Sequence, residues 1–179
     1  YRDVHLVGHD GKAVFSQPHI RVPATWSDTA VTIASQKYFR GALDSPERED
    51  GIDKMVSRVV ETISGWGLED GYFDADTAKV FKDELSWLIL NQTGAFNIPV
   101  WFNVGVDDHP QCSACFILKV DDTLESIFAF ARSEAMIFKG GSGSGINFSS
   151  LRSSQEGLSG GGKASGPVCF MKGFDAFAG

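Results

Sequence analysis

The chain of 179 residues is long enough for one full-sized domain with its own core, and 42% of its residues are hydrophobic, with 14 Phe and 4 Trp. This composition argues against an intrinsically disordered protein. The net charge of −7 argues against general attraction to nucleic-acid backbones or anionic membranes, although a few local cations and backbone N–H groups can still hold a phosphate.

No apolar run reaches the roughly 20 residues that are needed to cross a bilayer, and the N-terminus lacks the apolar core of a secretory signal. The three cysteines do not make a disulfide framework. The sequence therefore predicts a cytoplasmic protein with reduced thiols and no membrane partner. Neither end carries a helix cap or a polar tail, so we expect the chain to be one piece of a longer polypeptide.

Residues 1–94 are expected to form a mostly helical region that opens with a hairpin. The turn signal Asp10-Gly11 lies between short apolar runs, which is typical of two antiparallel strands. Thr25 or Ser27 is a candidate N-cap for the helix that follows, because either side chain can accept a hydrogen bond from the first helical turn. The polar stretch 41–51 is expected to be a solvated loop.

Two longer helices are predicted in the rest of this region. Apolar residues at helical spacing indicate an amphipathic helix over residues 52–63, and Ser64-Gly65 is expected to end it. Asp74 or Asp76 is a candidate cap for a second helix, which Thr93-Gly94 ends. We expect the apolar stripes of both helices to form core and assign them no chemistry.

Residues 95–179 have the pattern of an α/β region. Pro99–Phe102 and Cys115–Leu118 are apolar runs of strand length. A strong helix pattern follows the second run, with Asp122 as its N-cap and Glu125 completing a capping box.

The glycine-rich segment 140–145 is expected to be a turn, followed by a possible strand at 146–148 and a helix over Val168–Phe177. Strands that alternate with helices imply a parallel sheet. The predicted fold class is therefore α/β, with a domain boundary near residue 94.

Cys112 and Cys115 form a C-x-x-C motif, which His109 extends to H-x-x-C-x-x-C. A structural zinc site would need four ligands, and no second close pair follows, so zinc is a minor alternative. A thioredoxin-type pair would lie at a helix N-terminus, where the thiolate is stabilised, whereas Cys115 opens an apolar run of strand length. The spacing alone leaves open whether Cys115 is an inert core cysteine or a redox thiol.

The four glycines from Gly140 to Gly145 follow a helix and precede a strand, which is the reverse of the order in a P-loop or a dinucleotide-binding fingerprint. The segment is therefore either a flexible linker or a backbone that approaches a ligand closely, because glycine has no Cβ. Arg152 and Lys163 follow in sequence and are candidate phosphate ligands, although each is also typical of ordinary surface.

Three segments stand in order along the second half of the chain: His109–Ile117, with Cys115 in the context Ser-Ala-Cys-Phe; Lys139–Arg152, with Gly-Gly-Ser-Gly-Ser-Gly; and Gly160–Pro167. Together they resemble the N-terminal part of an adenosylcobalamin-dependent (class II) ribonucleotide reductase. The catalytic fold of that family is a ten-stranded α/β barrel. The resemblance implies that this chain holds the helical N-terminal region and the first strands of the barrel.

The resemblance also implies a function, which is the conversion of ribonucleoside di- or triphosphates to deoxyribonucleotides by thiyl-radical chemistry. Cys115 matches the first of two cysteines that reduce the substrate by becoming a disulfide, and its partner is expected beyond residue 179. Cys112 and Cys169 match no redox position. The residues implied to contact the substrate are Asn97, Ile98, Ala114, Gly140, Gly141, Gly143, Gly145 and Asn147.

An effector site is implied as well. Asp122 matches an acidic contact to the ribose of an effector nucleotide, Arg152 matches a phosphate contact, and Lys163 is a weaker match for the same role. The implied partners are adenosylcobalamin, a ribonucleotide substrate, a deoxynucleotide effector, a thioredoxin-like reductant, the remainder of the reductase and, as one option, a second copy of the chain. No metal ligand is assigned. The 179 residues alone are expected to be inactive, because half a barrel leaves open edges and an incomplete site.

Three alternatives stay open at this point. Ile98 stands where the family has a serine, and isoleucine cannot hydrogen-bond a substrate, which favours a non-catalytic nucleotide-binding or subunit-interaction module derived from a reductase. The large subunit of a class I reductase shares the redox strand and the glycine loop, although residues 14–40 and the glycine pattern favour the cobalamin branch. A small zinc-binding adaptor built on the cysteine motif is the third.

Overall fold

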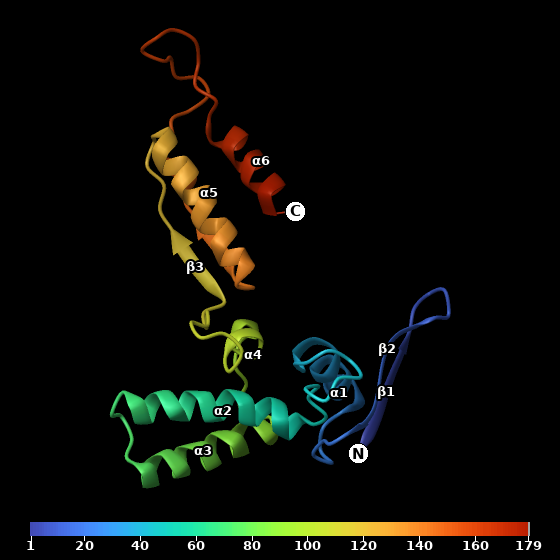
Figure 1. Cartoon of the computed structure of the whole chain (residues 1–179). Helices are drawn as coiled ribbons and strands as arrows, with labels where there is room; N and C mark the ends of the chain where they lie inside the picture. Colours follow the sequence, from blue (N-terminus) through green and yellow to red (C-terminus); the bar gives the residue numbers. More distant parts are fainter. Residues whose placement is uncertain (179) are drawn as a thin grey trace. The chain divides into compact units, whose positions relative to one another are not determined.

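The chain divides between Pro110 and Gln111 into two units in the computed structural model, which describes residues 1–178 (Figure 1). The first unit holds β1 (Arg2–Val7), β2 (Ala13–Ile20), α1 (Asp28–Ile33), the π-helical turn η1 (Ala34–Tyr38), α2 (Ile52–Glu69), α3 (Ala75–Leu90) and α4 (Ile98–Asn103). The second unit holds β3 (Cys115–Leu118), α5 (Leu124–Lys139), β4 (Gly143–Ile146), the 3-10 turn η2 (Phe148–Ser150) and α6 (Pro167–Ala178). This mixture of helices and strands agrees with the predicted α/β class. The units divide later in the chain than residue 94, because α4 packs with the first unit; the domain boundary itself stays a prediction.

The predicted N-terminal hairpin is confirmed. β1 pairs antiparallel with β2, and the backbone N–H of Gly8 donates to the carbonyl of Lys12 at 2.8 Å to close the turn. Gly11 lies in this turn with a φ of 76°, a conformation that glycine adopts at little cost. Of the two candidate caps, Ser27 begins α1, and its hydroxyl accepts from the N–H of Ala30 at 3.2 Å.

The first long helix, α2, is longer than the sequence predicts. The sequence predicts an end at Ser64-Gly65, but the helix continues to Glu69. The hydroxyl of Ser64 donates to the carbonyl of Ala78 at 3.1 Å, and a Cβ on Gly67 would lie 2.3 Å from the ring of Phe73. These positions are small or polar because α3 and the turn before it pack against them, so the prediction of a stop at Ser64 is wrong.

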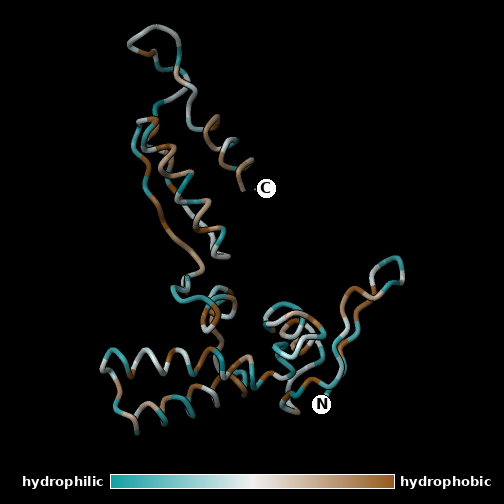
Figure 2. The backbone as a smooth tube through the Cα atoms, viewed as in Figure 1, coloured by the Kyte–Doolittle hydropathy of each residue, from teal (hydrophilic) through white to brown (hydrophobic). Residues whose placement is uncertain are grey.

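The core of the first unit is centred on α2, along which hydrophobic and hydrophilic residues alternate in Figure 2. Asp74, rather than Asp76, caps α3, because its carboxylate accepts from the N–H of Thr77 at 2.7 Å. The predicted apolar stripe of α2 is confirmed as core. Its most deeply buried side chains are Ile52, Met55, Val56, Val59 and Val60.

The apolar run Pro99–Phe102 was predicted to be a strand and instead forms most of the short helix α4. Pro99 lies in the first turn, where its fixed φ suits a helix and its missing N–H removes no helical bond. Val100 and Trp101 are buried in the core of the first unit. The strand prediction is wrong because the length of a buried apolar run does not separate a strand from a short helix.

A buried ion pair between Glu49 and Arg58 connects the end of the polar stretch 41–51 to α2. The Nε of Arg58 donates to the carboxylate of Glu49 at 2.7 Å, and these side chains are only 12% and 9% exposed. The second oxygen of Glu49 accepts from the N–H of Arg40 at 2.9 Å, and Arg58 also donates to the carbonyl of Val104 at 2.8 Å. The end of the stretch is therefore buried, whereas the sequence predicts a solvated loop throughout.

Replacing Glu49 with alanine is expected to lower the free energy of unfolding by about 3–5 kcal/mol, because the buried charge of Arg58 would lose its compensating carboxylate. Chemical denaturation of the purified protein measures this change. Glu61→Ala is the matched control, since Glu61 pairs with Lys82 at 2.7 Å on the surface, where their side chains are 57% and 43% exposed. Its loss should cost at most about 1 kcal/mol. Equal losses in the two variants would contradict a structural role for the buried pair.

In the second unit, β3 and β4 form a parallel pair. The crossover helix α5, which follows β3 in Figure 1, joins them. The predicted strand Cys115–Leu118 and the parallel pairing are confirmed. The segment 140–145 was expected to be a turn, yet it supplies most of β4, which begins where the N–H of Gly143 donates to the carbonyl of Ala114 at 2.8 Å. The strand predicted at 146–148 therefore lies nearer the N-terminus. Two strands do not by themselves make the ten-stranded barrel that the resemblance implies.

The N-cap of α5 is Thr123, whose hydroxyl accepts from the N–H of Ser126 at 3.2 Å. The predicted capping box of Asp122 and Glu125 is therefore wrong. The carboxylate of Asp122 bonds instead to Arg152, which a pattern based on neighbouring residues cannot reveal.

Aromatic rings form the core of the second unit. Phe130 meets Phe174 edge-to-face with ring centroids 4.7 Å apart, and Phe148 stacks on Phe174 at 5.7 Å. These contacts join α5, η2 and α6, so the segment between β4 and α6 is held at both ends by aromatic packing.

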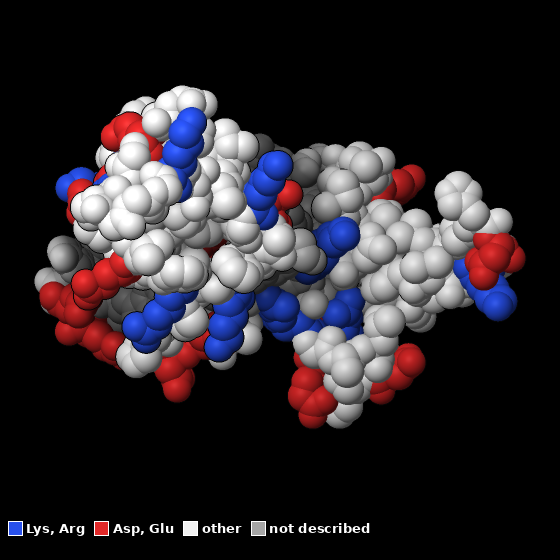
Figure 3. All heavy atoms as spheres, turned by 90° about the horizontal axis from the view of Figure 1, so that it is seen from above, with Lys and Arg blue, Asp and Glu red and all other residues white. Residues whose placement is uncertain are grey.

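Side chains of both charge signs are interspersed with uncharged surface on the face shown in Figure 3. Among residues 1–178, no helix combines the length and the hydropathy that crossing a membrane requires.

Candidate functional site

The two faces of the β3–β4 pair differ. Along β3, Cys115 and Ile117 are exposed, the latter to 86%, whereas Phe116 and Leu118 are partly buried. Paired residues of a parallel ladder project to the same side, and the partners of Cys115 and Ile117 are Gly143 and Gly145. The thiol of Cys115 therefore stands on an open face to which the neighbouring strand contributes no side chain.

The structure accounts differently for the lack of a side chain at each glycine of segment 140–145. Gly141 has a φ of 78°, which a side chain would strain. A Cβ on Gly140 would lie 2.5 Å from the amide nitrogen of Gln111, so close packing within the protein excludes one. In contrast, a Cβ on Gly143 would meet nothing closer than a carbonyl oxygen at 3.9 Å, and one on Gly145 would meet the end of Ile117 at 3.0 Å. Backbone conformation explains Gly141 and packing explains Gly140, whereas at Gly143 the packing leaves room for a side chain that the sequence does not supply.

Cys115 is exposed at the start of a strand, so it is not the buried core cysteine that the spacing left open. Cys112 is exposed too, and partial burial of its sulfur raises the pKa of that thiol above its ordinary value. Within residues 1–178, no group of three or more His, Cys, Asp and Glu side chains could hold a metal ion. The described residues therefore offer the zinc-adaptor hypothesis no site.

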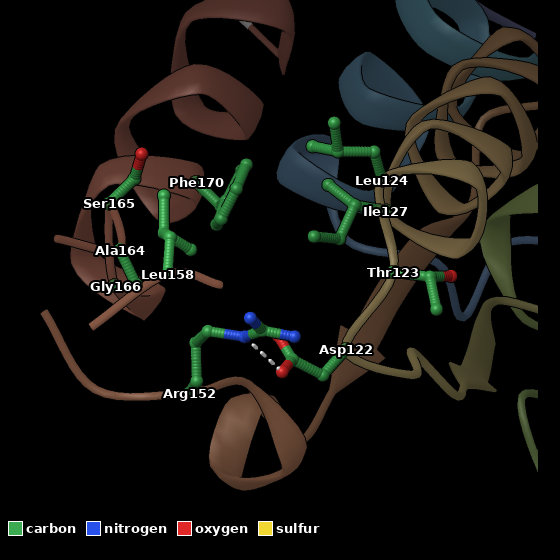
Figure 4. Close-up of a pocket in the computed structure, with 10 residues that line it drawn as sticks. All are labelled: Asp122, Thr123, Leu124, Ile127, Arg152, Leu158, Ala164, Ser165, Gly166 and Phe170. Carbon is green, nitrogen blue, oxygen red and sulfur yellow. Dashed lines mark hydrogen bonds and ion pairs between the residues drawn. The ribbon is translucent and has the colours of Figure 1, made fainter. Parts of the chain in front are cut away.

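A pocket of about 360 Å³ lies beside the first turn of α5 (Figure 4). Asp122 and Arg152 meet on one side of it through a hydrogen bond of 2.5 Å between Nε and a carboxylate oxygen. Leu124, Leu158 and Phe170 supply apolar walls from α5, the segment between η2 and α6, and α6 itself. A charged pair beside apolar walls suits a ligand that carries both an anionic group and a flat apolar part.

The guanidinium of Arg152 holds the pKa of the Asp122 carboxyl below its ordinary value, chiefly by hydrogen bonding. Asp122 is therefore ionised at neutral pH, and protonation of its carboxylate in acid would weaken the pair. Lys163, the third predicted effector residue, does not line the pocket; its Nζ lies 3.4 Å from the Oε1 of Gln155, and Ala164 beside it is in the wall. The structure thus brings Asp122 and Arg152 together and leaves Lys163 at the margin.

The remaining predicted site residues fall into two groups. Asn97 and Ile98 belong to the first unit, where Asn97 is the N-cap residue of α4 and Ile98 is 49% exposed. Ala114 precedes Cys115 in the second unit, and the Oδ1 of Asn147 accepts from the N–H of Ser149 at 2.9 Å to begin η2. Asn147 therefore has a local structural role that the sequence did not reveal.

Sequence reasoning also missed Gln111, Leu158 and Phe170. The Gln111 amide packs on Gly140, and it donates to the carbonyl of Ile137 at 3.1 Å at the end of α5. Only contacts between distant segments identify these residues. For Gln111 the sequence did offer one indication of a site residue, because it lies in the same short segment as Cys112 and Cys115.

Two protein families match the chain. The family described as class II vitamin B12-dependent ribonucleotide reductase matches residues 2–92. The family described as ribonucleotide reductase, barrel domain, matches residues 113–179.

Curated relatives carry consistent names. A vitamin B12-dependent ribonucleotide reductase of Streptomyces clavuligerus is 50% identical over 99% of this chain and 19% of the relative. One of Rhodopirellula baltica is 42% identical over 99% of the chain and 20% of the relative. A vitamin B12-dependent ribonucleoside-diphosphate reductase of Mycobacterium tuberculosis strain H37Rv is 30% identical over 84% of the chain and 21% of the relative. The chain thus spans about a fifth of the length of the curated relatives that it matches.

Proposed function

Because this chain belongs to the class II vitamin B12-dependent ribonucleotide reductase family, we propose that it supplies a redox cysteine, a substrate-facing strand and an effector pocket to such an enzyme. The observation that carries the proposal is the open face of the β3–β4 pair, where Cys115 stands beside the bare backbone of Gly143. The family matches do not favour the class I alternative. We also propose that β3 and β4 are two strands of the ten-stranded barrel of that family.

In the proposed reaction, Cys115 is one of two thiols that reduce the ribonucleotide. The 2′ hydroxyl leaves as water, and the two thiols lose two electrons and two protons as they become a disulfide. A thiyl radical on another cysteine begins the reaction by taking the 3′ hydrogen and returns it at the end. Among residues 1–178 we assign no partner thiol to Cys115, since Cys112 and Cys169 match no redox position.

The position of Cys115 on a strand suits this role. A strand that is hydrogen-bonded along its length holds a side chain more firmly than a loop does, and the reaction needs the sulfur within contact of the sugar. The bare backbone at Gly143 would let the ribose approach β4 closely. We place Ala114, Gly140, Gly141 and Asn147 around the same substrate. The substrate contacts of Asn97 and Ile98 stay a prediction.

The cobalamin is implied by family membership, and we propose the adenosyl form, which would supply the radical when bound. The pocket of about 360 Å³ beside α5 lies at the small end of the range for drug-sized ligands, and a corrin ring is larger than such ligands. We therefore assign none of the described residues to the cobalamin.

We assign the pocket beside α5 to a deoxynucleotide effector. Asp122 would bond to the ribose, Arg152 and Lys163 would bond to the phosphates, and Leu158 and Phe170 would contact the base. Arg152 is already paired with Asp122, so a phosphate competes with a carboxylate for the guanidinium. We further propose a thioredoxin-like reductant for the disulfide and a homodimer. The cytoplasmic location stays a prediction.

Replacing Arg152 with alanine is expected to weaken the binding of a deoxynucleotide effector about tenfold to a hundredfold, because a hydrogen bond to a charged group contributes roughly 1.5–3 kcal/mol. Titration calorimetry on the protein expressed from its complete reading frame measures the dissociation constant. Lys172→Ala is the control, since Lys172 is an exposed cation of α6 outside the pocket. An unchanged dissociation constant in Arg152→Ala would contradict the effector assignment.

A second candidate function is a non-catalytic nucleotide-binding module, which Ile98 favours because an exposed isoleucine replaces the serine of the family. The test is ribonucleotide reduction by the protein expressed from its complete reading frame, with a dithiol reductant and with or without adenosylcobalamin. Cobalamin-dependent formation of deoxyribonucleotides supports the reductase. Tight nucleotide binding without turnover supports the module. The 179 residues alone are expected to form no deoxyribonucleotide, because the second reducing thiol is not assigned among them.

A further inference from the structure

The face of β4 that points away from Cys115, here called its back, is polar. Ser142 and Ser144 alternate with Gly143 and Gly145, and Ser144 pairs with Phe116, whose side chain is turned away from the open face. Ser142 is 7% exposed, and Ser144 is partly buried. The alternating Gly-Ser pattern is therefore a strand with a bare front and a hydroxyl-bearing back.

Ser144 is tied to α5 by a charged hydrogen bond. Its hydroxyl donates to the Oε1 of Glu134 at 2.7 Å. The other carboxylate oxygen of Glu134 is buried and has no hydrogen-bond partner among residues 1–178. Hydrogen bonds to an ionised acceptor are about twice as strong as neutral ones, and the hydroxyl of Ser144 is the donor that the described residues offer this carboxylate.

Ser142 makes a second tie. Its hydroxyl accepts from the amide nitrogen of Gln111 and donates to the carbonyl of Ser113. Gln111 also donates to the carbonyl of Ile137 at 3.1 Å. This chain of bonds connects the last turn of α5, the entry to β4 and the segment that leads into Cys115.

A glycine-rich strand such as β4 needs hydrogen bonds of this kind to hold its backbone in place. Glycine loses more conformational freedom on folding than any other residue and offers no side chain to pack, so a strand interior rich in glycine is weak. The front of β4 cannot carry anchoring side chains without filling the space beside Cys115. The anchors therefore belong on the back, where Ser142 and Ser144 lie.

We propose that Glu134 and Ser144 are positioning residues, which hold the backbone of Gly143 and Gly145 at a fixed distance from the thiol of Cys115. This inference rests on the proposed function, since it assigns β4 a substrate to position. A displacement of about 1 Å in a reacting group can cost on the order of a hundredfold in rate. The bond between Glu134 and Ser144 acts through the strand and does not touch the substrate.

The test uses the protein expressed from its complete reading frame, with two readouts. Ser144→Ala is expected to lower kcat/KM for the ribonucleotide by at least about tenfold, which is part of the cost of a misplaced group. It is also expected to speed hydrogen exchange at the amides of Gly143 and Gly145, while the effector dissociation constant stays unchanged. Ser133→Ala is the matched control, because Ser133 is an exposed serine of α5 whose hydroxyl donates to the carbonyl of Ala129 within the same helix.

Variants of Glu134 separate positioning from general folding. Glu134→Gln keeps an acceptor for the Ser144 hydroxyl and is expected to retain most activity, whereas Glu134→Leu should resemble Ser144→Ala. The double variant with Glu134→Leu and Ser144→Ala should be no worse than either single one, because both remove the same bond. If Ser144→Ala does not fold, the comparison of Glu134→Gln with Glu134→Leu still decides.

The outcomes distinguish the inference from the function on which it rests. If the unsubstituted protein reduces no ribonucleotide, the proposed function fails, and the exchange rates of Gly143 and Gly145 still test the anchoring. If it reduces ribonucleotides and Ser144→Ala matches Ser133→Ala in both readouts, the inference is overturned. Additive losses in the double variant also overturn it.

Discussion

Cys115→Ser is expected to abolish ribonucleotide reduction, with a loss of at least about a thousandfold, which is within the range seen when a reacting group is deleted. A serine hydroxyl has nearly the same shape as the thiol but cannot form the disulfide that supplies two electrons. Because the change replaces one atom on the open face of β3, substrate and effector binding should persist. Turnover assays with adenosylcobalamin and a dithiol, together with equilibrium binding of the nucleotide, measure the two effects separately.

Cys169→Ser is the matched control for this variant, since Cys169 is an exposed cysteine of α6 and has no assigned role. Its turnover should equal that of the unsubstituted protein. Substantial turnover in Cys115→Ser would contradict the redox role. A simultaneous loss of nucleotide binding would instead indicate damage to the strand.

Gly143→Val is expected to lower kcat/KM for the ribonucleotide by about a hundredfold, the effect of displacing a substrate by roughly 1 Å. The backbone accepts a Cβ at this position without a clash, because its nearest neighbour is the carbonyl oxygen of Ala114 at 3.9 Å. Valine also favours a strand, so the stability of the protein should be retained or raised. We therefore expect a lower kcat/KM in steady-state kinetics together with an unchanged or higher Tm in thermal unfolding.

Gly65→Val serves as the control for Gly143→Val. Gly65 lies in α2, and a Cβ there also meets nothing within 4 Å, but it belongs to no proposed site. The substitution should leave kcat/KM unchanged. Normal kinetics in Gly143→Val would sink the proposal that substrate lies against β4.

Several features of the fold could be predicted from the sequence because they depend on neighbouring residues. The hairpin at Asp10-Gly11, the apolar stripe of α2 and the strand Cys115–Leu118 follow from turn signals and from periodicity. The C-terminal end of α2 and the helical state of Pro99–Phe102 could not be predicted, because a close approach of α3 and burial in the core decide them.

The candidate site divides in the same way. Cys115, Asp122, Arg152 and the glycines could be selected from motif order and from a family resemblance, which the family matches bear out for the chain as a whole. Glu134 and Ser144, which support the strand on its other face, could not be selected in this way. Glu134 carries no motif, and its importance in the structure depends on a hydroxyl that the parallel pairing brings to it.

The sequence by itself determined the α/β class, the strand that carries Cys115 and the kinship with cobalamin-dependent reductases, because local periodicity and the order of short motifs express these properties. Only the tertiary structure decided which face of the sheet the thiol occupies, that Asp122 pairs with Arg152 rather than capping α5, and that Ser144 anchors to Glu134. Asp122 and Arg152 are 30 positions apart in the chain. Contacts over such separations form when strand pairing and core packing bring the segments together, and no pattern within a single segment specifies them.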